Sequence, residues 1–210
     1  MKVISFTNNP FQENTYLVYD ETKECLIIDP GCYTESERKV LIDFIEENDL
    51  KPVRLLNTHC HLDHICGNQF IANKYGLKLE ANKEELPILE HAPKAAQLYG
   101  FPMEESPGID NFLTEEDVIK FGKSKLSIFF TPGHSPGSIS FYSEKFEFVI
   151  AGDVLFKQGI GRTDLPLGDY DTLIKSINEK LFTLPKKTIV YSGHGPETSV
   201  GYELVNNPFF

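Results

Sequence analysis

Short runs of β-branched and aromatic residues, each bounded by turn residues, recur along the whole chain. Runs of about four to eight such residues predict β-strands. The predicted strands cover residues 2–6, 15–19, 24–28, 53–57, 77–79, 125–130, 138–142, 146–150 and 188–191. Helical patterns stand between several of them, so the hydrophobic pattern indicates strands mixed with helices.

The clearest helix is predicted over residues 35–47. Thr34 and Glu37 have the spacing of a capping box at its start. Apolar residues then follow at helical intervals along one face. Further helices are predicted over residues 65–75, where Gly76 supplies a C-terminal stop, and over residues 170–182.

The least regular part of the chain is the segment 83–112. Residues 83–99 follow a helical pattern that Pro87 and Pro93 interrupt, and Gly100 ends it. Residues 101–111 are loop-like and contain Pro102, Pro107 and Gly108. We interpret the whole segment as a lid or a pocket wall.

Length and charge narrow the possible classes of protein. A chain of 210 residues fits one domain, and we find no repeat or linker that would divide residues 1–210. The formal net charge of −11 disfavours broad contact with nucleic acid or an anionic membrane. The N-terminus lacks a signal-peptide pattern, and no apolar run reaches the length of a membrane span. The four cysteines form no Cys-x-x-Cys pair and suit the reduced thiols of a cytoplasmic protein.

One stretch contains four possible metal ligands: His59, His61, Asp63 and His64 lie in the order His-x-His-x-Asp-His. Imidazole nitrogens and carboxylate oxygens suit Zn, Fe or Mn. The stretch holds half of the six histidines in the chain, and it follows the predicted strand 53–57 directly. It therefore predicts a metal site with room for two ions, rather than a polar loop that is rich in histidine by chance.

Possible ligands recur where predicted strands end. Strand-like runs lead through small or turn residues to His59, His134, Asp153 and His194, and a further run ends directly at Asp29. Strand ends can converge on one rim of a sheet, where rigid elements hold side chains in place. We expect these residues to form one site. His91 stands outside the pattern and is interpreted as a surface or pocket-wall residue, and Cys60 as a packed or partly exposed thiol rather than a ligand.

In these motifs the chain resembles the glyoxalase II-like (hydroxyacylglutathione hydrolase) group of metallo-β-lactamase-fold hydrolases. The matching segments are residues 58–64 (THCHLDH), 131–138 (TPGHSPGS), 151–156 (AGDVLF), 159–162 (GIGR) and 192–195 (SGHG). They span most of the chain in the family's order. The resemblance implies an α/β (α+β) fold, a four-layer α/β/β/α sandwich with its site at one edge of two sheets.

The resemblance also implies roles for individual residues. The first metal site would comprise His59, His61 and His134. The second would comprise Asp63, His64 and His194, with Asp153 bridging both ions. Asp29 corresponds to an acidic residue that orients the His-rich loop from behind the ligands. Arg162 holds the place of a basic residue that meets an anionic thiol substrate; the alternative is a structural arginine paired with Asp164 or Asp169.

The implied reaction is hydrolysis of a small acyl-thiol ester by a hydroxide that bridges two divalent metal ions. Zinc is the favoured metal, and iron and manganese fit the same ligands. Asp63 and Asp153 are the catalytic candidates, Asp63 by orienting the hydroxide. The expected partner is a small thioester, without nucleic acid or membrane, and the oligomeric state stays open.

Two features leave the substrate open. Sixteen residues follow His194, fewer than the C-terminal helical domain that makes much of the glutathione contact in full-length glyoxalase II. The segment Gly161-Arg162-Thr163-Asp164 also resembles the persulfide dioxygenases of the same fold. Those enzymes use one iron, which here would be held by His59, His134 and Asp153. The runner-up is therefore a mononuclear iron persulfide dioxygenase.

Overall fold

The structure is a computed structural model that describes residues 1–101 and 103–210. Internal contacts divide the chain into two compact units. The first comprises residues 1–113 and 120–125, and the second comprises residues 114–119 and 126–210. The expectation of one domain over residues 1–210 stays a prediction. Within the described residues, no helix has both the length and the apolar character needed to cross a membrane.

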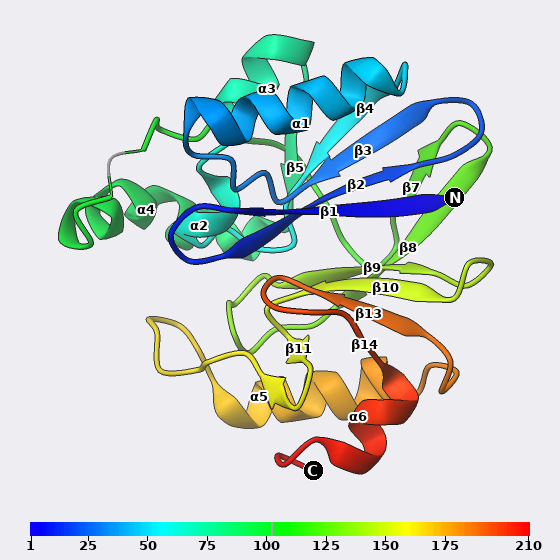
Figure 1. Ribbon diagram of the computed structural model, residues 1–210. Coiled ribbons are helices and arrows are strands. Elements are labelled where there is room, and N and C mark those ends of the chain that lie inside the picture. The colour runs from blue at the N-terminus through cyan, green and yellow to red at the C-terminus, as the bar shows by residue number, and fades with distance from the viewer. Residues whose placement is uncertain (102) are drawn as a thin grey trace. The chain divides into compact units, whose positions relative to one another are not determined.

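The first unit is built on a six-stranded sheet with the order β1-β2-β3-β4-β5-β6 (Figure 1). Strands β1 to β3 pair antiparallel, whereas β3 to β6 pair parallel. The strands are β1 (Lys2–Asn8), β2 (Glu13–Tyr19), β3 (Glu24–Ile28), β4 (Lys51–Leu56), β5 (Leu79–Ala81) and β6 (Ile109–Phe112). The helices are α1 (Glu35–Glu47), α2 (Leu62–Ile65), α3 (Asn68–Tyr75), the 3₁₀ turn η1 (Lys83–Glu85) and α4 (Leu86–Leu98).

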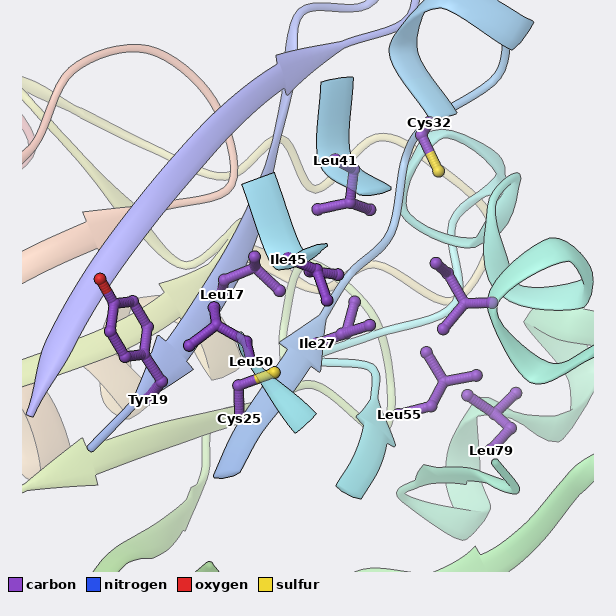
Figure 2. Packing of buried hydrophobic residues seen from close by; sticks show 11 residues of the cluster. Leu17, Tyr19, Cys25, Ile27, Cys32, Leu41, Ile45, Leu50, Leu55 and Leu79 are labelled. Carbon is purple, nitrogen blue, oxygen red and sulfur yellow. The ribbon is translucent and has the colours of Figure 1, made fainter. Parts of the chain in front are cut away.

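The core of this unit lies between the sheet and α1 (Figure 2). Leu17, Ile27 and Leu55 come from three neighbouring strands and are fully buried. They belong to one cluster with Leu41 and Ile45 of α1. Burying a leucine or isoleucine side chain contributes about 1.5–3 kcal/mol relative to leaving it exposed. This packing makes the strands β3 and β4 a rigid base for whatever follows them.

The predicted start of α1 is confirmed in detail. The Thr34 hydroxyl accepts a hydrogen bond from the Glu37 N–H, and the Glu37 carboxylate accepts one from the Thr34 N–H. The helix covers residues 35–47, as predicted. Both bonds join residues within one turn, so the capping box can be predicted from the sequence alone.

A second six-stranded sheet has the order β14-β13-β10-β9-β8-β7, and the hairpin β11–β12 stands apart from it. The strands are β7 (Val118–Phe121), β8 (Ser124–Phe130), β9 (Ile139–Ser143), β10 (Phe148–Gly152), β11 (Leu155–Phe156), β12 (Gly159–Ile160), β13 (Ile189–Ser192) and β14 (Thr198–Ser199). Helix α5 (Tyr170–Ser176) continues as the π-helical segment η2 (Ile177–Leu181), and α6 (Val200–Asn206) follows β14. Leu173 of α5 and Val200 of α6 share one buried cluster with Val149 and Val190 of the sheet.

Several local predictions were wrong. The helix expected over 65–75 is two helices: α2 begins earlier, at Leu62, and α3 begins after Gly67 and ends at Tyr75 before Gly76, as predicted. A Cβ on Gly67 would stand 2.5 Å from the Pro30 carbonyl oxygen, and the Gly67 N–H donates to that same oxygen. The strand expected over 77–79 is β5, two residues further along.

Helix α4 also differs from expectation, because it runs through Pro93 without ending. Pro87 stands in its first turn, where its missing N–H has no partner to lose. Ile88 and Ala92 pack with Cys60 and Ile65, and this packing offsets the hydrogen bond that Pro93 removes. Residues 109–112, expected mostly as loop, form β6, and Pro102 lies outside the described residues.

Candidate metal centre

Strand ends bring the predicted ligands of each sheet to one edge. In the first sheet, β3 and β4 are parallel neighbours, so Asp29 and the His-rich loop follow adjacent strand ends. In the second sheet, β10 and β13 are parallel neighbours, and Asp153 and His194 follow them. Strand β8 is antiparallel to β9, which is antiparallel to β10, so β8 also ends at that edge, ahead of His134.

The four predicted ligands of the first unit lie close together after β4: His59 and His61 in the loop, and Asp63 and His64 in the short helix α2 that follows it. The His59 ring lies 4.9 Å from the His61 ring and 4.1 Å from the His64 ring, between centroids. The Asp63 Oδ2 lies 3.8 Å from His64 Nε2. His59 and His64 are buried, whereas His61 and Asp63 are partly exposed. The loop therefore presents its donors from a largely dry environment.

Asp29 sets the proton positions on two of these rings. Its Oδ2 accepts a 2.6 Å hydrogen bond from the Thr58 hydroxyl, which lies 3.0 Å from His59 Nδ1. Because that hydroxyl donates to Asp29, it accepts from His59, so His59 carries its proton on Nδ1. His64 Nδ1 lies 3.2 Å from Asp29 Oδ2 and carries its proton there for the same reason. Both rings thus keep Nε2 as the nitrogen able to bind a metal.

Two further buried acidic residues lie near the loop, and the sequence predicted neither: Glu85 braces it by a hydrogen bond, and Glu13 lies beside His64. Glu85 accepts a 2.7 Å hydrogen bond from the Cys60 N–H. Glu13 Oε1 lies 4.0 Å from His64 Nδ1, and burial raises the pKa of Glu13 well above its ordinary value. Nothing local marks either residue, because Glu13 is close to the loop only through the fold and Glu85 lies 25 residues beyond Cys60.

Asn9 joins the loop to its neighbours. This residue has φ 51°, a left-handed conformation that asparagine tolerates better than most residues. Its side-chain amide donates to the carbonyl oxygens of Gly31, at 3.0 Å, and Asp63, at 2.9 Å. Gly31 itself has no room for a side chain, because a Cβ there would overlap the Glu13 carboxylate. The backbone around Asp63 is therefore tied to two other segments of the first unit.

In the second unit, Asp153 faces both histidines. Its Oδ2 lies 3.5 Å from His134 Nε2 and 3.5 Å from His194 Nε2. His134 Nδ1 lies 2.8 Å from the Arg162 carbonyl oxygen, which can only accept. His134 therefore carries its proton on Nδ1 and turns Nε2 toward Asp153. His134 is buried, and Asp153 and His194 are partly exposed.

The donor sets in both units fit a divalent metal. Bonds of about 2.0–2.1 Å in a tetrahedral arrangement put neighbouring donor atoms about 3.3 Å apart. The separations around Asp153 are of this size. In the first unit, donor atoms of Asp29, His59 and His64 lie within 4.8 Å of one another, and the hydrogen bonds of Asp29 make it the support of the two rings rather than a ligand. Nitrogen and carboxylate oxygen donors suit Zn, Fe and Mn without selecting one of them.

The Arg162 side chain pairs with Asp164. Its Nε and one terminal nitrogen contact the two carboxylate oxygens at 2.7 Å each. This hydrogen bond lowers the pKa of Asp164 to about 2. Both side chains are well exposed, and exposed ion pairs contribute little to stability. The structural pairing considered for Arg162 is present, and its contact with a substrate stays a prediction.

Two other expectations concern residues outside the ligand set. Cys60 is fully buried, and burial raises the pKa of its thiol well above the ordinary value, which favours a packed thiol. All four cysteines are free. His91 is exposed on α4, as predicted for a surface residue. In the segment 83–112, a cavity of about 340 Å³ is lined by Pro93, Ala96, Gln97, Gly100, Phe101 and Met103.

Comparison with known proteins gives a family match over most of the chain. Residues 8–194 match the model described as the Metallo-beta-lactamase superfamily. The chain is 41% identical over 202 residues to the probable metallo-hydrolase YqgX of Bacillus subtilis, covering 95% of this chain and 93% of that protein. It is 40% identical over 201 residues to hydroxyacylglutathione hydrolase GloC of Haemophilus influenzae, with the same coverage.

Solved structures give the same result for the fold. The BLEG-1 B3 metallo-beta-lactamase has a TM-score of 0.91 at 38% identity and covers 99% of both chains. TTHA1623, solved in a di-iron-bound form, has a TM-score of 0.89 at 35% identity over 99% of this chain and 100% of its own. ETHE1 from Myxococcus xanthus has a TM-score of 0.80 at 25% identity over 99% of this chain and 84% of its own. The expected metallo-β-lactamase-type α/β fold is confirmed.

Proposed function

The chain belongs to the Metallo-beta-lactamase superfamily, and from that premise we propose that it is a dinuclear metal-dependent hydrolase of small acyl-thiol esters. The observation that carries the proposal is the orientation of the histidines. His59, His64 and His134 each have a hydrogen-bond partner at Nδ1 that leaves Nε2 for a metal. Such partners on metal-binding histidines are typical of functional sites.

We assign seven ligands to two ions. One ion would be held by His59, His61 and His134, and the other by Asp63, His64 and His194. Asp153 would serve both, which its position between two imidazole nitrogens supports. When bound, such ions lower the pKa of a water to near 7 and polarise a carbonyl oxygen. Zinc is our first choice, and iron stays in view because TTHA1623 was solved in a di-iron-bound form.

The chain's own residues supply the remaining functions. Asp63, partly exposed at the start of α2, would orient the nucleophilic hydroxide in addition to holding a metal. Asp29 and Glu85 hold the loop that leads to Asp63. Arg162 can leave its exposed pairing with Asp164 to meet an anionic group of the substrate. The similarity to GloC supports a thioester of the hydroxyacylglutathione kind as the substrate class.

A second candidate function is favoured by two observations. Residues 161–164 have the sequence expected of a persulfide dioxygenase, and the chain is similar to ETHE1 from Myxococcus xanthus. One iron would then be held by His59, His134 and Asp153. This reaction consumes oxygen, whereas hydrolysis of a thioester does not, so the two functions can be separated directly.

The deciding experiment measures metal content and two activities on one preparation. Cleavage of S-lactoylglutathione is followed by thiol release, and oxygen uptake is followed with glutathione persulfide. We expect two metal ions per chain and thiol release without oxygen uptake. One iron per chain, with oxygen uptake and no thiol release, would exclude the hydrolase and establish the dioxygenase.

A further inference from the structure

The hairpin β11–β12 contacts each predicted ligand of the second unit. It begins two residues after Asp153, and at its far end the Gly161 N–H donates to the Val154 carbonyl. The next residue, Arg162, offers the carbonyl that holds His134 Nδ1. The Phe156 ring lies 6.3 Å from the His194 ring, edge to face. The hairpin and the two residues after it thus lie against the Asp153 backbone and the His134 and His194 rings.

Close packing makes this support sensitive to small shifts. A Cβ on Gly161 would stand 1.9 Å from the Asp153 carbonyl oxygen and 3.1 Å from the His134 Cβ. The backbone of the hairpin therefore passes directly against two predicted ligands. If the hairpin moved outward, the Arg162 carbonyl would leave His134 Nδ1, and the ring would lose the main-chain acceptor that holds its proton there.

The hairpin is too short to hold this position by itself. Its ladder joins only Leu155 with Ile160 and Phe156 with Gly159. Two-stranded hairpins are at best marginally stable alone in water. Its turn also contains Gln158 at φ 57°, a left-handed conformation that is unfavourable for most non-glycine residues. External contacts must therefore fix it.

Those contacts come from the end of the chain. The fully buried Glu203 of α6 accepts a 2.9 Å hydrogen bond from the Gln158 N–H in the hairpin turn. Asn207, just after α6, donates through its side-chain amide to the Gly159 carbonyl at 3.1 Å and to Glu203 at 2.9 Å. The Thr198 hydroxyl donates to the second oxygen of Glu203. One buried polar network therefore holds the turn where it enters β12, at Gln158 and Gly159.

We propose that Glu203 and Asn207 are positioning residues for the metal ligands of the second unit, acting through the hairpin β11–β12. The proposal rests on the proposed function, because it takes His134, Asp153 and His194 as metal ligands. A buried carboxylate is costly unless its acceptor sites are used, and three donors meet Glu203. Through these hydrogen bonds, α6 and Asn207 fix the hairpin, the hairpin fixes the Arg162 carbonyl that follows it, and that carbonyl orients the His134 ring.

The test uses Asn207→Ala and Glu203→Gln in the full chain, with Asn206→Ala as the matched control. Asn206 is the exposed neighbour of Asn207. Its side-chain amide donates to the Tyr202 carbonyl within the same helix, so it serves as a control outside the network around Glu203. Glutamine at 203 keeps one acceptor oxygen but loses the other. Asn207→Ala is the milder change, because Glu203 keeps its bonds to Thr198 and Gln158.

Two measurements separate this proposal from the proposed function. In metal-free protein, the Nδ1 proton of His134 is followed by ¹H–¹⁵N NMR, and its exchange with solvent should speed up in both variants but not in Asn206→Ala. Zinc affinity, measured by competition with a chelating indicator, should fall about 10-fold, the low end for outer-shell changes. Unchanged proton exchange and affinity in both variants would overturn the proposal. A wild-type chain that binds no zinc would instead overturn the metal assignment, while the proton measurement still tests the hairpin.

Discussion

The two units hold their predicted ligands by different means. In the first unit, four ligands lie within six residues that run from the loop after β4 into α2, and the buried carboxylates of Asp29 and Glu85 brace that loop. In the second unit, His134, Asp153 and His194 come from three separate strand ends, and a main-chain carbonyl and a short hairpin hold them. A loop that leaves the sheet needs side-chain acceptors for its backbone, whereas ligands next to strand ends are already held by the sheet.

The comparison predicts that changes in the two units differ in kind. Removing a carboxylate behind the first loop should release a segment that carries four ligands at once. Removing a ligand from the second unit should cost that ligand and leave its neighbours in place. The following substitutions test this contrast, in order of decreasing effect on activity.

Asp153→Ala should have the largest effect. It removes the carboxylate that faces both His134 and His194, and we expect thioester hydrolysis to fall by more than about 100-fold, beyond the range of outer-shell changes. Metal content per chain and initial rate are measured together. Asp171→Asn, an exposed aspartate in the first turn of α5, is the control. Normal metal content and rate in Asp153→Ala would remove Asp153 from the site.

Asp29→Asn should come next. Asparagine keeps the shape and tolerates the φ of 49°, but it has only one acceptor atom. Oδ2 of Asp29 accepts from the Thr58 hydroxyl and His64, and Oδ1 accepts from the Thr58 N–H, so one side of this arrangement is lost. We expect metal affinity to fall about 10- to 100-fold. The free energy of unfolding should also fall by about 1–3 kcal/mol, because buried donors lose their acceptor. Chelator competition and urea unfolding measure the two effects, and a loss of stability without any loss of affinity would confine Asp29 to folding.

Glu85→Gln should have a smaller effect of the same kind. The glutamine oxygen can still accept from the Cys60 N–H, but the bond is no longer assisted by charge. We expect the free energy of unfolding to fall by about 1 kcal/mol, and metal affinity to fall less than in Asp29→Asn. Glu84→Gln, its exposed neighbour in η1, serves as the control. Equal losses in the Glu84 and Glu85 variants would contradict a specific brace.

Asp20→Asn should leave hydrolysis unchanged, because the hydrogen bonds of the Asp20 carboxylate go to Thr22, Lys123 and Ser124 and not to the His-rich loop, within the described part of the chain. Burial alone would raise the pKa of Asp20, but hydrogen bonds from Thr22, Lys123 and Ser124 outweigh it and lower the pKa to about 2. Because the pKa of Asp20 is lower in the folded state than the value of about 3.9 in the unfolded state, its ionised carboxylate stabilises the fold at pH values above about 4. This stabilisation is lost as the pH falls toward 2.

The measurement for Asp20→Asn is therefore unfolding as a function of pH. At neutral pH the variant should be less stable than wild type by about 1–2 kcal/mol, from weakened hydrogen bonds to the carboxylate. The difference should shrink between about pH 4 and pH 2, where the wild-type carboxyl becomes protonated. A difference that stays constant over this range would show that the charge of Asp20 is not the source of the stabilisation.

The sequence by itself determined what depends on neighbours along the chain. The capping box of α1 joins Thr34 to Glu37, and the motif of the first unit lies within one loop. Strand ends marked His134, Asp153 and His194 because each ligand directly follows an apolar run and a glycine. These signals survive without the fold because each one is complete within a few residues.

Only the tertiary structure decided which residues support those ligands. Glu85 reaches Cys60, Glu203 reaches Gln158, and the Arg162 carbonyl reaches His134 across 25, 45 and 28 residues of chain. Packing of Ile88 and Ala92 likewise carries α4 through Pro93, against its local preference. A hydrogen bond or a packing contact between distant segments depends on where the chain folds them, and no local pattern of residue types contains that position.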